Sequence, residues 1–154
     1  MLAKSKKILS ILLLIICIIA GYTLFLSLRP VEIIAVHREG EFNDILVKNF
    51  PYTDQGKIKW WLENESILKE KYKIPNPAKD GFFSMTFWLF GDGYKKAEKY
   101  DRLCFYDIKT KEKCIEKDPV FSVSNSKNRG TILTVYDGTY HLKTNGEIIK
   151  LKRD

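Results

Sequence analysis

A long apolar run near the start of the chain predicts a membrane-spanning helix. Residues 8–28 include no charged side chain. At about 1.5 Å per helical residue, they would reach roughly 31 Å, which is the thickness of a bilayer core. A cleaved signal peptide is the alternative, but its apolar region is normally about 7 to 15 residues long and ends in a small-x-small site. This sequence has neither feature, so we expect an uncleaved anchor.

Alternating apolar and polar residues after this run predict a β-hairpin. The two strand-like runs are Val31–His37 and Asp44–Phe50, and a turn around Gly40 separates them. The cluster from Pro51 to Gly56 then ends the alternation. We therefore expect two paired strands directly after the anchor.

A single amphipathic helix is predicted next. Either Thr53 or Asp54 can cap a helix that continues to about Tyr72. Apolar residues recur on one face of this segment at helical spacing, which indicates that the helix packs on a sheet. The residues of that face are Ile58, Trp61, Leu62, Leu68 and Tyr72.

The rest of the chain is typical of an antiparallel sheet. Phe82–Phe90 is apolar on both faces, which predicts a central, covered strand, whereas Gly91–Asp101 is polar and predicts a mobile connection. Turn-forming residues then separate further strand-like runs. These runs are 120–124, 131–136, 139–143 and 147–152. The fold class is therefore α+β: an N-terminal transmembrane helix, then a small domain with a mainly antiparallel sheet and one amphipathic helix.

Charge gives the anchor an orientation and argues against nucleic-acid binding. The net charge is +7, but four basic residues flank the apolar run, and without them only +3 remains, with mixed signs along the chain. We expect no nucleic-acid partner.

A short basic N-terminus is usually retained inside, while long domains translocate largely regardless of charge. We therefore predict a cytoplasmic segment 1–7, a transmembrane helix 8–28 and a periplasmic domain 29–154.

Two of the three cysteines flank a predicted hairpin in the exported part. Strands Leu103–Asp107 and Lys111–Glu116, joined by a three-residue loop centred on Lys109, would place Cys104 opposite Cys114. Directly opposed residues have Cβ atoms about 4.5 to 5.5 Å apart, close to bridging distance. We favour a structural disulfide over free thiols. A metal site would need two more ligands, and a catalytic redox pair usually has two intervening residues.

The segments LSLRPVEIIAVH, LVKNFPYTDQGKIKWWLENESILKEKYKIP and DRLCFYDIKTKEKCIEKDPVFSVSNS together resemble a known family. It is the domain of unknown function 943, a family of enterobacterial membrane proteins, and the resemblance covers nearly the whole chain. It implies a bacterial source, one N-terminal membrane pass and an exported domain. The family brings no established reaction and no catalytic residues.

No motif in the sequence indicates an enzyme. There is no Gly-x-Ser-x-Gly elbow, no glycine-rich phosphate loop and no zinc-protease helix, so we expect no catalytic residues, no cofactor and no metal. Asp92, between two glycines, is more typical of a tight turn than of acid–base chemistry. We also read His141, in a predicted strand, as structural. An unrecognised enzyme would need a cluster that joins Asp92, Asp101 or His141 to another polar group.

A small exported domain without catalytic motifs favours a binding function. Trp60 and Trp61 are adjacent on the helix and cannot both face the core, so Trp60 would lie on a flank. We take Trp60, Trp88, Asp92 and Tyr94 as candidate partner-binding residues. The first hypothesis is a protein partner in the envelope, with the domain acting as an inhibitor or immunity factor against a toxin. The alternative is an envelope glycan, lipid or other small ligand.

Overall fold

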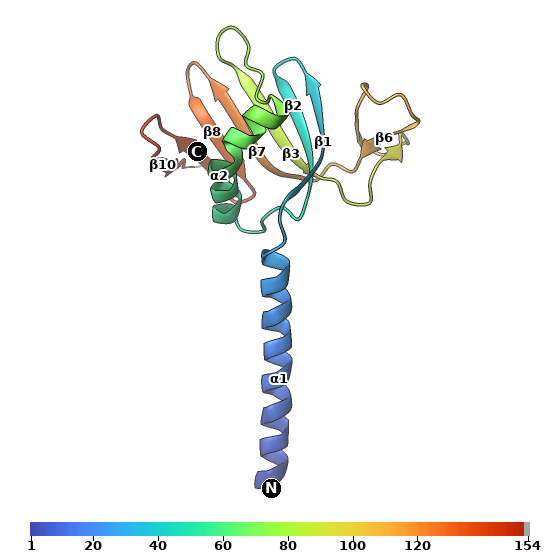
Figure 1. Ribbon diagram of the computed structural model, residues 1–154, viewed down its shortest axis with the longest axis vertical. Helices are drawn as coiled ribbons and strands as arrows, with labels where there is room; N and C mark the ends of the chain where they lie inside the picture. Colours follow the sequence, from blue (N-terminus) through green and yellow to red (C-terminus); the bar gives the residue numbers. More distant parts are fainter. Residues whose placement is uncertain (153–154) are drawn as a thin grey trace. The chain divides into compact units, whose positions relative to one another are not determined.

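The computed structural model describes residues 1–152, which form two compact units (Figure 1). The first unit is Met1–Pro30, and the second begins at Val31. The first unit is a single helix, α1, over Leu2–Ser27, with no buried residue. It starts before the predicted residue 8 because the short basic segment contains no helix breaker. Pro30 disfavours helical geometry at the residue before it, which explains why the helix ends here.

A seven-stranded sheet forms the centre of the second unit. Its strand order is β1-β2-β3-β7-β8-β9-β10. All neighbouring strands are antiparallel except β2 and β3, which are parallel. The strands are β1 Glu32–Glu39, β2 Phe42–Lys48, β3 Phe83–Leu89, β7 Pro119–Ser126, β8 Gly130–Val135, β9 Gly138–Leu142 and β10 Ile148–Lys150. The α+β prediction is confirmed. The parallel pair was not foreseen.

The helix α2, Asp54–Tyr72, accounts for the parallel pair. It connects β2 to β3 and carries the chain back to the end where β2 began, as a crossover between parallel strands must. Its predicted limits are confirmed. The Thr53 side chain accepts a hydrogen bond from the Gly56 backbone N–H at 3.0 Å, and Lys73 follows the helix in a left-handed conformation.

The main core lies between α2 and one face of the sheet. Ile58, Trp61 and Leu68 are buried as predicted, but Leu62 is 45% exposed, so its assignment to the core face was wrong. Leu62 follows Trp61 directly, and one step rotates a helical side chain by about 100° away from its neighbour. The sheet contributes buried apolar residues from four strands: Ile45, Val47, Met85, Phe87, Phe121, Val123, Leu133 and Val135.

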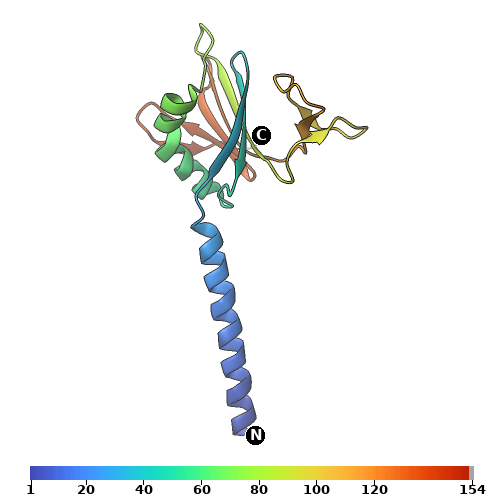
Figure 2. The ribbon, with the colours of Figure 1, turned by 45° about the vertical axis from the view of Figure 1, so that its right-hand side comes forward.

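A second, three-stranded sheet covers part of the opposite face (Figure 2). Its order is β4-β6-β5, with β4 Lys95–Lys96, β5 Leu103–Cys104 and β6 Glu112–Ile115. It belongs to the segment 90–118, which we call the disulfide module. The prediction that 91–101 is only a mobile connection was wrong, because β4 pairs with β6. The strands β5 and β6 are shorter than the predicted 103–107 and 111–116, and β4 was not predicted.

The turns on either side of β8 lie close to their predicted positions. The expected turn at Asp137-Gly138 is shifted by one position, because Gly138 already pairs with Val135 as the first residue of β9. The turn after β7 ends with Gly130 at φ +66°, a conformation that favours glycine, and β7 continues to Ser126, beyond the predicted run 120–124. The C-terminal meander is otherwise confirmed.

Candidate functional site

The disulfide module is closed by the predicted bond. Cys104 and Cys114 are direct partners in the register of β5 and β6, their Cα atoms are 3.9 Å apart, and their sulfur atoms are bonded. The sequence-based pairing is therefore confirmed. Beneath the bond, Phe105 and Ile115 are buried against Leu46 of the large sheet. This apolar contact fixes the module on the sheet.

A second set of contacts holds the rim of the module together. Arg102 is the central residue, with a side chain only 10% exposed. Its guanidinium donates hydrogen bonds to the Lys96 carbonyl at 2.8 Å and to the Glu116 carboxylate at 2.9 Å. The bond from Arg102, and after it one from the Lys95 ammonium at 3.3 Å, favour the charged form of Glu116 and so lower the pKa of that carboxyl. One arginine thus connects β4, β5 and the end of β6.

An irregularity in β1 turns His37 toward the module. Ile33 pairs with Val47, but Ala35 pairs with Leu46, so the register shifts by one residue between them. Ile33 faces the core under α2, and without this bulge His37, four residues further on, would face the same way. With the bulge, His37 stands opposite Asp44 and faces Phe105 of the module.

His37 is the centre of a hydrogen-bonded cluster with Tyr94 and Asp107, which we call the His37 cluster. Its Nδ1 lies 2.7 Å from one oxygen of Asp107, and its Nε2 lies 2.8 Å from the Tyr94 hydroxyl. An ionised carboxylate can only accept, so Nδ1 donates to Asp107. In a neutral ring, Nε2 then accepts from the Tyr94 hydroxyl. The ring of His37 also stacks on Phe105, with centroids 3.8 Å apart.

Burial shapes the electrostatics around this cluster. It is the main reason why the pKa of Asp44 is raised, although Trp88 Nε1 donates to this carboxylate at 2.7 Å and opposes the shift. The pKa of Tyr94 is raised first by burial and then by the negative charge of Asp107. Tyr94 therefore stays protonated at neutral pH and remains a hydrogen-bond donor.

The cluster has the order of groups found in nucleophilic triads, carboxylate then imidazole then hydroxyl. Here the hydroxyl is a phenol whose pKa is raised, so its ionised, nucleophilic form is disfavoured. The arrangement suits a clamp, in which one buried imidazole joins β1 to two separate segments of the module. A depression of about 250 Å³ beside the cluster is lined by His37, Asp44, Tyr106 and Asp107 among other residues.

The structure separates the four candidate partner-binding residues. Trp88 and Tyr94 lie on the module side of the sheet, in or beside the His37 cluster. Trp60 lies on the helix side, where its ring packs against Phe50 and Phe87 at centroid distances of 5.0 and 5.7 Å. Asp92 lies in an exposed turn, 3.7 Å from the Lys95 ammonium. Only Trp88 and Tyr94 are thus brought together.

The polar residues considered for chemistry are also dispersed. Asp101 pairs with Lys117 at 2.5 Å, and His141 lies on β9 beside Gly130. His37 and Asp107 were missed as partners because they are seventy positions apart and join only through the bulge. The one feature of the sequence that could have pointed to this pair is His37 itself, a polar residue in a largely apolar predicted strand.

The family model described as "Enterobacterial putative membrane protein (DUF943)" matches residues 2–152. This match confirms the resemblance inferred from the sequence. No curated protein and no solved structure matches the chain.

Proposed function

Because the chain belongs to this family of enterobacterial membrane proteins, we propose that it is a single-pass inner-membrane protein that binds a protein partner in the periplasm. Residues 1–7 would be cytoplasmic, and the domain from residue 29 would be periplasmic. The helix α1 supports the anchor, since it is long and apolar enough to cross a bilayer. The Cys104–Cys114 bond supports export, because disulfides persist in oxidising compartments.

The observation that carries the binding proposal is the restrained loop between the two cysteines. The disulfide closes it, Phe105 is buried beneath it, and the His37–Asp107 bond holds the loop three residues after Cys104. Tyr106 lies between these fixed points and is 85% exposed. Its ring lies against the Lys113 ammonium, 4.9 Å from the ring centroid.

A restrained loop that exposes a tyrosine has the properties of an interface anchor. Tyrosine contributes large contact areas at protein interfaces and is enriched among residues that dominate binding energy. Ordering a loop on binding costs free energy, and a loop already held by a covalent bond and a buried contact avoids most of that cost. We propose that the partner is an envelope protein and that the domain acts as an inhibitor or immunity factor against a toxin.

Site-specific photo-crosslinking tests this proposal. A benzophenone amino acid would replace Tyr106 in the full-length protein in intact envelopes, and Tyr136, which is 86% exposed on another loop, serves as the matched control. We expect a discrete protein adduct from position 106 that is absent from position 136. Replacing both Cys104 and Cys114 by serine should weaken the adduct. Identical adduct patterns at 106 and 136, or none at 106, would contradict the proposal.

A second candidate function is the binding of a small envelope ligand on the helix side. A cavity of about 350 Å³ lies beside α2 and is lined by Trp61, Phe83, Pro75 and Pro77 among other residues. Within the described part of the chain, the buried Trp61 Nε1 has no hydrogen-bond partner, which favours an acceptor in this cavity. Saturation-transfer NMR with envelope glycans and lipids would test it. Binding that survives replacement of Trp61 by phenylalanine would exclude this cavity.

A further inference from the structure

Two exposed tyrosines lie at the end of the large sheet where the chain enters it. Glu32 at the start of β1 pairs with Lys48 at the end of β2. The strand β8 runs in the same direction as β2, so the ends of both strands lie at this edge. Tyr52 follows β2 and is 81% exposed, and Tyr136 follows β8 and is 86% exposed. With Asp54, Lys57, Asp137 and Tyr140 they line a depression of about 700 Å³, which we call the strand-end surface.

Lys57 is the unusual residue of this surface. It lies in the first turns of α2, is only 6% exposed and lines the depression. No ion pair or hydrogen bond joins its ammonium to any side chain or carbonyl of residues 1–152. The stem of the side chain is buried, whereas the ammonium is not among the enclosed unpaired atoms of the described residues and therefore opens into the depression. The position is therefore suited to an anion that comes from outside the chain.

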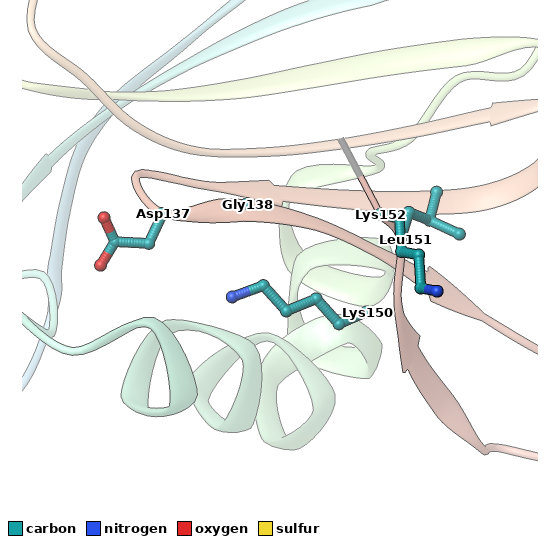
Figure 3. Close-up of a pocket in the computed structure, with 5 residues that line it drawn as sticks. All are labelled: Asp137, Gly138, Lys150, Leu151 and Lys152. Atoms are coloured by element: carbon teal, nitrogen blue, oxygen red, sulfur yellow. The ribbon is translucent and has the colours of Figure 1, made fainter. Parts of the chain in front are cut away.

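Acidic groups lie on the same surface and restrict the kind of anion. Asp54 and Asp137 both line the depression, yet neither lies within 4.0 Å of the Lys57 ammonium. Lys150 crosses beside Gly138 and extends toward Asp137 (Figure 3). The strand-end surface thus carries one cation, Lys57, and two carboxylates, and Lys150 lies beside it. A purely anionic ligand would meet repulsion from both aspartates, whereas a ligand carrying both charges would find a partner for each.

We propose that the strand-end surface binds the head group of a zwitterionic phospholipid with a primary amine, such as phosphatidylethanolamine. The phosphate pairs with Lys57, the ammonium pairs with Asp137 or Asp54, and Tyr52 and Tyr136 lie at the level of the head groups. Charge-assisted hydrogen bonds supply the selectivity, and tyrosine is enriched at membrane–water interfaces.

The length of the connecting chain favours a lipid over a soluble ligand. Five residue steps separate Ser27, the last residue of α1, from Glu32, and they span at most about 18 Å. If α1 spans the bilayer, this short tether raises the local concentration of lipid head groups around the second unit. This inference therefore rests on the membrane anchor of the proposed function, but not on the protein partner.

Hydrogen exchange of the full-length protein in nanodiscs tests the inference. Three lipid compositions are compared: phosphatidylcholine alone, phosphatidylcholine with phosphatidylethanolamine, and phosphatidylcholine with phosphatidylglycerol. Amides of 52–57 and 136–140 should exchange about tenfold more slowly in the ethanolamine discs, the effect of one charge-assisted hydrogen bond. Amides of the turn 127–129, at the opposite end of β7, should not change.

Two variants and one control complete the test. Lys57→Met keeps the buried stem and removes the charge, and the double change Asp54→Asn with Asp137→Asn removes both ammonium partners, so each variant should abolish the slowing. The control is Lys59→Met, on the same helix, where the lysine side chain is 75% exposed. Equal exchange in all three disc types, equal slowing by phosphatidylglycerol, or a Lys57→Met variant that still responds would overturn the inference. Lys57→Met should also fold normally in detergent, since a lysine that only supports the fold would destabilise the protein when replaced.

Discussion

The clamp formed by His37 should stabilise the attachment of the disulfide module to the sheet, and His37→Phe isolates its polar part. Phenylalanine keeps a flat ring that can stack on Phe105, but it removes the bonds to Asp107 and Tyr94. The perturbation therefore leaves packing nearly intact and deletes two hydrogen bonds. Asp107 and Tyr94 remain, but the phenylalanine ring offers no donor to Asp107 and no acceptor to Tyr94.

The magnitude follows from the exposure of the two partners. A hydrogen bond to a charged group contributes about 1.5 to 3 kcal/mol, but the Asp107 side chain is 54% exposed and regains water, so about 1 kcal/mol is retained. The bond with the Tyr94 hydroxyl contributes about 1 kcal/mol more. His37→Phe should thus lower the free energy of unfolding by about 2 kcal/mol. His37→Ala also loses the stacked ring and should cost about 3 to 4 kcal/mol.

Denaturant unfolding of the full-length protein in micelles measures this directly. All three tryptophans, Trp60, Trp61 and Trp88, lie in the second unit, so their fluorescence reports its unfolding and not that of α1. Asp107→Ala completes a double-mutant cycle with His37→Phe, and the coupling should be about 1 kcal/mol. A loss below about 0.5 kcal/mol for His37→Phe, or additive effects of the two changes, would refute the clamp.

Three further predictions concern other parts of the second unit. Burial raises the pKa of Asp44 above its ordinary 3.8, so the stability that this group contributes is present below pH 3.8 and is lost as the pH rises through the raised pKa of the folded protein. Asp44→Asn still accepts a hydrogen bond from Trp88 and should remove this loss of stability when unfolding is measured as a function of pH. Replacing Cys104 and Cys114 by serine should lower the free energy of unfolding by about 3 kcal/mol, as expected for a loop of this length, and a reducing agent should then have no further effect. Thr53→Ala should cost about 1 kcal/mol through loss of the α2 cap while Thr53→Ser costs little, and equal losses in thermal melts would argue against capping.

Local signals were sufficient to predict the parts of the fold that depend on neighbours in sequence. The limits of α2 follow from Thr53 and from the residues after Tyr72, and the pairing of Cys104 with Cys114 follows from the centre of one short loop. Both are decided within a few residues, where capping and turn geometry act. The apolar helix α1 is similarly local, because the length and apolarity of one continuous segment predict it.

The arrangement of the His37 cluster could not be predicted in this way. In a regular strand, Ile33 and His37 would face the same side because they are four residues apart. The bulge between them places them on opposite sides, and the pattern of apolar residues does not reveal it. The parallel pairing of β2 with β3 likewise depends on how α2 packs, not on either strand. The candidate partner-binding residues also proved to lie apart, because the sequence did not show which side of the sheet each one faces. Trp60 and Trp88 lie on opposite sides.

The two ends of the disulfide module lie next to each other. Trp88 on β3 pairs with Pro119 on β7, and the Leu89 backbone N–H donates to the Asp118 carbonyl at 3.0 Å. The module is thus an excursion within what would otherwise be a simple hairpin, and a tight turn could close the same two strands. Such an insertion could be exchanged between proteins as one piece, provided the new scaffold supplies both the apolar patch around Leu46 and the His37 contacts with Asp107 and Tyr94. A graft of this kind would carry the Tyr106 loop to a new scaffold without rebuilding the seven-stranded sheet.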